Sequence, residues 1–167
     1  MRKILLTGLA VLMVLFITAC GSEEEDEVLD FHNDMVDTLQ PIYEEVGALG
    51  EEIMTLSDEE VYEKLEQELV PKAEESEKFF AKYDPETEPT IEYYGLRKAA
   101  NDDFVTYAYE AKDITKDLID GKITEDEFLN QVIEATEYMD LFIDKSEEAD
   151  ARWEEISDEY SFEEIKE

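Results

Sequence analysis

Residues 128–160 read FLNQVIEATEYMDLFIDKSEEADARWEEISDEY, and they carry the clearest structural signal in the chain. Apolar and small residues recur there at alternating steps of four and three, which places them along one face of a helix. These positions are Phe128, Val132, Ala135, Met139, Phe142, Ser146, Ala149, Trp153, Ile156 and Tyr160. Of the other 23 positions, 11 are acidic. The pattern therefore predicts a long amphipathic helix with one face packed against other helices.

Three further apolar stripes precede this one. The first runs over residues 28–56 and the third over residues 93–118, both with steps of three and four throughout. The second, over residues 61–83, is less regular. Together with the last stripe they predict four amphipathic helices.

The junctions between the stripes support this division. Residues 56–61 (LSDEEV) and 123–128 (ITEDEF) each place a hydroxyl residue three positions before a glutamate and flank the pair with apolar residues. This is the pattern of a capping box with a hydrophobic staple at the start of a helix. Gly121 is suited to the left-handed cap of the preceding helix, and residues 84–89 (DPETEP) form the middle connection. We therefore predict an all-α, antiparallel four-helix bundle built from two long αα-hairpins.

Two prolines fall inside predicted helices. Pro41 lies in the first and Pro71 in the second. Proline has no amide donor and its ring crowds the preceding turn. We expect kinks or breaks near both residues.

The single cysteine, Cys20, closes the run Ile17-Thr18-Ala19-Cys20 after an apolar stretch over residues 4–17 that follows Arg2 and Lys3. A basic start, an apolar core and small residues before a cysteine resemble the leader and lipobox of bacterial lipoproteins. The apolar stretch holds about 14 residues, whereas a spanning helix needs about 20. A cleaved leader is therefore favoured over a retained transmembrane helix.

The resemblance implies that signal peptidase II removes residues 1–19 and that Cys20 carries the lipid. The mature protein would be anchored at the extracytoplasmic face of the cell membrane. Residues 20–27 would form an acidic tether, residues 28–160 the bundle, and residues 161–167 a frayed tail. Because no second cysteine exists, the fold must be held by its apolar core and not by a disulfide.

The charge of the chain is strongly one-sided. It holds 14 basic and 48 acidic residues, with a formal net charge of −34 at pH 7. Such a surface repels nucleic acid and anionic headgroups and attracts basic partners. Carboxylate oxygens also suit calcium and magnesium, so we expect weak, nonspecific binding of divalent cations.

Residues 120–128 (DGKITEDEF) resemble the second half of an EF-hand calcium loop, because Gly121, Ile123 and Glu127 have the matching spacing. The same alignment puts Lys116 first and Leu118 third, and neither offers a carboxylate. We interpret this segment as a capped turn between helices.

The sequence does not favour an enzyme. His32 is the only histidine, and no nucleophile elbow or phosphate-binding glycine loop is present. We expect His32 to lie on the surface beside Asp34, and we predict no catalytic residues, no cofactor and no specific metal site.

Two functions remain, beside the simpler interpretation that the acids only keep an exposed bundle soluble in a saline or alkaline habitat and that the partner-binding face lies elsewhere. The first is a non-enzymatic adaptor or inhibitor that engages a basic protein through its acidic face. The alternative is an extracytoplasmic solute- or cation-binding lipoprotein with its site between the hairpins, near Pro41, Pro71 and the helix glycines Gly47 and Gly50. A cavity with converging polar groups would favour the alternative.

Overall fold

The computed structural model describes residues 23–162, and within them it contains helices and turns without strands. The elements in chain order are α2 (Glu23–Ile53), α3 (Asp58–Lys64), η1 (Leu65–Leu69), α4 (Val70–Ala81), α5 (Glu88–Ile119) and α6 (Glu125–Tyr160). Because α3, η1 and α4 follow one another without a break, the elements form four rods. The predicted all-α four-helix bundle is confirmed.

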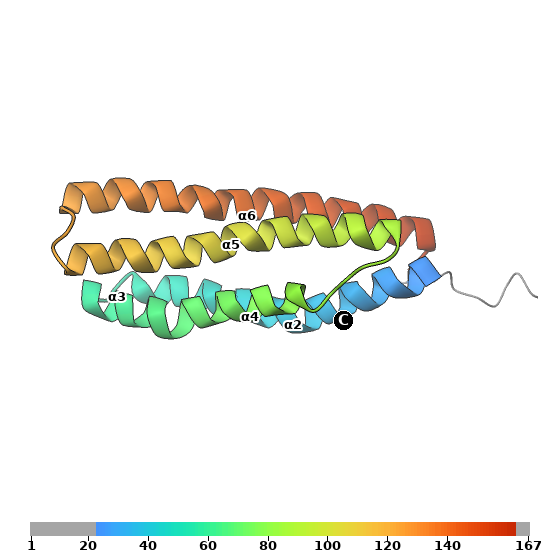
Figure 1. Ribbon diagram of the computed structural model, residues 1–167, viewed down its shortest axis with the longest axis horizontal. Helices are drawn as coiled ribbons and strands as arrows, with labels where there is room; N and C mark the ends of the chain where they lie inside the picture. The colour runs from blue at the N-terminus through green and yellow to red at the C-terminus, as the bar shows by residue number, and fades with distance from the viewer. Residues whose placement is uncertain (1–22, 163–167) are drawn as a thin grey trace, which may run out of the picture.

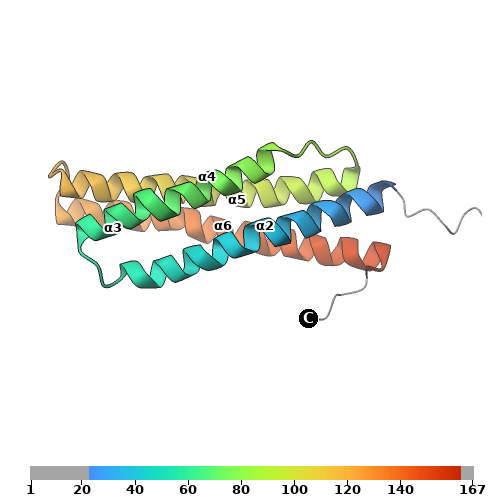
Figure 2. The same cartoon turned by 90° about the horizontal axis from the view of Figure 1, so that it is seen from below.

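The rods pair as two antiparallel hairpins. Figure 1 shows α6 along one edge of the molecule, α5 in the middle, and α2 with α3 and α4 on the other side. Helix α5 packs against all the other elements, whereas the main packing partner of α6 is α5 alone. The view in Figure 2 shows the start of α2 and the end of α6 at one end of the bundle, with the α5–α6 turn at the other.

The interior consists of two hydrophobic clusters along the rod. The first joins α2 to the end of α4 and to the C-terminal part of α6, and it includes Phe31, Tyr93 and Ile156. The second joins the end of α2 to η1 and the middle of α5, and it includes Leu65 and Phe104. All members of both clusters belong to residues 28–162. A chain without residues 1–19 therefore keeps the whole described core.

Both predicted capping boxes are present. The backbone N–H of Ser57 donates to the Glu60 carboxylate over 2.9 Å, and the hydroxyl of Ser57 accepts from the Glu60 backbone. Thr124 and Glu127 repeat this arrangement at the start of α6. Gly121 has a φ of +67°, as expected for a left-handed helix cap.

The acidic segment before residue 28 differs from its prediction as a tether, because α2 already begins at Glu23. Its carboxylates lie in the first turn of α2, where the helix dipole favours negative charge. Glu27 also accepts hydrogen bonds of 2.8 Å from the backbone N–H groups of Glu86 and Thr87, at the start of α5. Partial burial opposes ionisation of Glu27, but these bonds and one from the Thr87 hydroxyl lower its pKa overall.

The two prolines have different consequences. Helix α2 runs through Pro41 without a break. Before Pro71 the chain widens into the π-helical turn η1, in which the Val70 N–H donates to the Leu65 carbonyl. A wider turn makes room where the proline ring would crowd the carbonyl four residues earlier. The predicted interruption is thus seen at Pro71.

Two residues of the predicted frayed tail, Ser161 and Phe162, contact helix α6. Ser161 adopts a left-handed conformation, and the Phe162 N–H donates to the Ser157 carbonyl over 3.0 Å. The Phe162 ring also stacks on Trp153, with centroids 5.7 Å apart. The predicted leader, Cys20 and residues 163–167 lie outside the described residues.

Candidate functional site

A chain of polar contacts links the two hairpins toward the end of the bundle at which α2 begins. Asp150 of α6 accepts from the Arg97 guanidinium of α5. Arg97 Nε donates to the Tyr93 hydroxyl over 3.1 Å, and that hydroxyl lies 2.9 Å from Nδ1 of His32 on α2. The Tyr93 hydroxyl also lies 3.9 Å from the sulfur of Met35, to which it can donate. The indole of Trp153 covers the other side of this histidine, with ring centroids 3.5 Å apart and planes 2° from parallel.

The surroundings keep His32 uncharged. Burial, and then the positive charge of Arg97, lower the pKa of His32 to about 4, while Asp150 acts weakly in the opposite direction. Burial also raises the pKa of Tyr93 to about 12. The cluster therefore contains one ion pair, between Arg97 and Asp150, and two titratable side chains that stay neutral, His32 and Tyr93.

The prediction that His32 lies on the surface is wrong. The side chain is partly buried between α2, α5 and α6. Asp34, its expected neighbour, instead accepts from the hydroxyl of Tyr83. Position 32 directly follows Phe31 of the core stripe, so it lies at the border of the apolar face. Only the approach of the Trp153 ring decides whether that border is covered.

A half-open cavity of about 390 Å³ lies next to this cluster, between α2 on one side and α5 and α6 on the other. Its lining residues are Met35, Val36, Leu39, Gln40, Tyr43, Glu44, Phe80, Arg97, Ala100, Phe142 and Ser146. Small side chains at Ala100 and Ser146 leave the space open. The Tyr43 hydroxyl donates to the buried Asn101 side chain over 3.2 Å, which fixes the ring in the wall.

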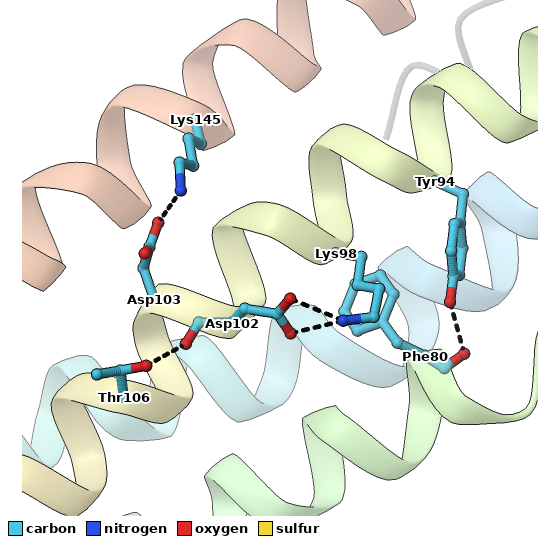
Figure 3. A network of polar contacts seen from close by, with 7 residues as sticks. All are labelled: Phe80, Tyr94, Lys98, Asp102, Asp103, Thr106 and Lys145. Carbon is cyan, nitrogen blue, oxygen red and sulfur yellow. Dashed lines mark hydrogen bonds and ion pairs between the residues drawn. The ribbon is translucent and has the colours of Figure 1, made fainter.

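Further polar contacts fix α5, which forms one wall of this cavity, between its neighbours (Figure 3). Lys145 Nζ of α6 donates to Asp103 over 2.5 Å. On the opposite side of α5, the Tyr94 hydroxyl donates to the backbone carbonyl of Phe80 near the end of α4, over 3.1 Å. These side chains hold α5 in register with both α4 and α6.

A second candidate site is an exposed apolar surface on the N-terminal half of α6, which we call the α6 apolar face. It consists of Leu129, Val132, Ile133 and Ile143, whose exposed fractions are 58%, 37%, 65% and 48%. Val132 was predicted to belong to the buried stripe of this helix, and that prediction is wrong. No element of the described chain covers this side of α6, because the main packing partner of the helix is α5.

Acidic side chains surround the α6 apolar face. Glu137, Asp140 and Asp144 continue along the same side of the helix at steps of three and four, and all three are exposed. Every lysine and arginine in residues 23–162 already forms an ion pair with an acid, and none of these pairs involves the three carboxylates. No lysine or arginine of the described chain therefore neutralises these three carboxylates, and this surface is strongly negative.

The segment that resembles an EF-hand forms the α5–α6 turn. Lys116 and Lys122 pair with Asp120 at 3.4 and 3.1 Å, and the Glu127 carboxylate accepts from the backbone of Thr124. Over residues 23–162, no three His, Asp or Glu side chains are placed to hold a metal ion.

Comparison with known proteins gives no relative: no family model, curated protein or solved structure matches this chain.

Proposed function

We propose that this protein is a lipid-anchored, acidic helical bundle of the bacterial cell envelope that acts without catalysis, as an adaptor or inhibitor that binds a basic protein. The single observation that carries the proposal is the α6 apolar face and its acidic surroundings. Leu129, Val132 and Ile133 are exposed next to one another on this helix, and exposed apolar residues rimmed by polar ones are typical of an interaction site.

Charge selects the kind of partner. A second copy of the chain would bring another strongly acidic surface to the same place, and like charges oppose such a contact. A basic amphipathic helix satisfies both features of the surface. Its apolar side would cover Leu129 and Ile133, and its lysines or arginines would reach Glu137, Asp140 and Asp144. The face spans residues 129–143, so a partner helix of about four turns, about 21 Å long, would match it.

The proposed anchor fits this use. The leader pattern places the lipid on Cys20, three residues before the start of α2. In the described part of the chain, no helix is both long and apolar enough to cross a membrane. The α6 apolar face lies toward the end of the bundle opposite the start of α2 (Figure 1). Helix α6 runs about 40 Å from Ile133 to Tyr160. The α6 apolar face would therefore lie about 40 Å from the end of the bundle at which the lipid is attached.

Site-specific photo-crosslinking in the producing cell tests the interaction. A photoreactive residue at Ile133 should capture one basic protein through a basic amphipathic helix, and the yield should fall as salt rises because charge attraction is screened. The matched control is the same residue at Met54, which is more exposed, at 84%, and directly follows the end of α2. Equal capture at both positions, or a captured segment that is not basic, would contradict the proposal.

The anchor has its own test. Mass spectrometry of the N-terminal peptide should find an acylated Cys20 at the start of the mature chain. Cys20→Ala should abolish acylation and processing at this position. A mature chain with a free thiol at residue 20, or one that begins elsewhere, would overturn the proposed anchor without affecting the test of the α6 apolar face.

A further inference from the structure

We infer that the cavity between α2, α5 and α6 binds a small uncharged organic molecule with an apolar body and one hydrogen-bond acceptor. This site is separate from the α6 apolar face and goes beyond the proposed function.

Size and lining indicate the apolar body. The cavity holds about 390 Å³ and is walled mainly by Met35, Leu39, Phe80 and Phe142. Ligand sites in proteins span about 300–1,000 Å³ and are lined mostly by apolar and aromatic side chains. A dry apolar cavity of about 150 Å³ is enough for benzene, so this one admits a molecule of eight to ten heavy atoms.

The charges around the cavity disfavour both kinds of ion. Arg97 lines the wall, with a side chain only 16% exposed, so a cationic group inside would face a poorly solvated positive charge. An anion would pass the exposed Glu44 at the edge of the cavity and meet an arginine already neutralised by Asp150. It would also approach a protein with a net charge of −34. An uncharged ligand avoids both penalties.

The polar side chains of the lining indicate the acceptor. Arg97, Gln40 and Ser146 all carry donor groups. The known bonds of Arg97 use Nε and Nη2, and neither uses Nη1. A hydroxyl or carbonyl oxygen on the ligand can therefore accept from this side of the cavity while the apolar body packs against the rings.

Three probes of equal chain length and different charge test the inference: 1-octanol, octanoate and octylammonium. The chain from Gly21 onward is used, because the described core lies entirely within it. Calorimetric titration should show that 1-octanol binds at least about tenfold more tightly than either ion, and it should raise the melting temperature. Equal or tighter binding of an ion, or binding of none of the three, would overturn the inference.

Matched substitutions locate the site. Ser146→Leu should fill the cavity and abolish the response to 1-octanol, whereas Ala151→Leu, at an exposed position of the same helix, should leave it unchanged. Gln40→Trp fills the cavity from an exposed position on α2, and it gives the same test if Ser146→Leu does not fold. Retained binding in a folded, filled variant would place the octanol elsewhere and overturn the assignment.

Discussion

The two halves of α6 carry the same apolar repeat and have different surroundings. In the C-terminal half, Ala149 and Ile156 are fully buried, and Trp153 stacks on His32 of α2. In the N-terminal half, Ala135 is the buried residue, while Val132 and its neighbours on the α6 apolar face are exposed. The repeat shows that both halves are helical and which side they turn inward, but it does not show how many helices cover them.

The reason lies in where α2 meets α6. Near the start of α2, Phe31 and His32 reach the C-terminal half of α6 and complete its burial. Farther along, the cavity lies between the two helices, with Val36 and Tyr43 on one side and Phe142 and Ser146 on the other. Half of α6 thus belongs to a bundle core, and the other half rests mainly on α5.

The largest expected effect comes from removing the same side chain in each half. Ile156→Ala should lower the free energy of unfolding by about 2–5 kcal/mol, because it leaves a cavity at a fully buried position. Ile133→Ala, at 65% exposure, should change it by less than about 0.5 kcal/mol. Urea unfolding followed by circular dichroism measures both values, and similar losses would remove the contrast between the halves.

The contact between α2 and the C-terminal half should also depend on pH. His32 has a folded pKa of about 4 against 6.5 for the free side chain, so it stabilises the fold above pH 6.5 and loses this contribution as pH falls toward 4. Between pH 7 and pH 5 the native protein should lose about 2 kcal/mol relative to His32→Gln. The carboxylates titrate in both proteins, so their contribution cancels in the difference. Parallel stability curves would show that His32 is not held neutral.

Hydrogen exchange compares the halves without any substitution. The amides of residues 126–143 should exchange faster than those of residues 149–158, because local unfolding of the N-terminal half breaks fewer side-chain contacts. We expect protection factors at least about tenfold lower in the N-terminal half, equivalent to about 1.4 kcal/mol. Mass spectrometry of short peptides or NMR would resolve this difference, and uniform protection along α6 would contradict it.

The smallest expected effect concerns the start of the N-terminal half. Thr124→Ala removes the N-cap hydroxyl and should destabilise the protein by about 1 kcal/mol. Thr136→Ala is the control in the middle of the same helix, where alanine is the better helix former and no loss is expected. Thermal melting checks both variants. An equal loss in the two would mean that the cap contributes nothing specific.

The local elements of the fold could be predicted because their causes are local. Ser57 with Glu60 and Thr124 with Glu127 cap the helices that their spacing predicted, and Gly121 takes the expected positive φ. Each of these effects depends on residues a few positions apart. The candidate sites could not be predicted in the same way. His32 lies 61 positions from Tyr93 and 121 from Trp153, and no spacing along the chain reports their contact.

The acidic segment from Glu23 shows the same limit. Its composition predicted a solvated tether, but Glu27 meets the amides of Glu86 and Thr87 and caps another helix. A carboxylate near the free amides of a helix start is stabilised in place, whatever the composition around it.

The order of residues was sufficient for the number of helices and for the capped starts of α3 and α6, since periodicity and capping act within a turn or two. The excess of acid was also plain from composition. The packing of α2 against α6 determined which apolar residues are covered, where the cavity lies and whether His32 is charged. Burial and charge neutralisation depend on distances between helices, and those distances are set by how all the side chains pack together.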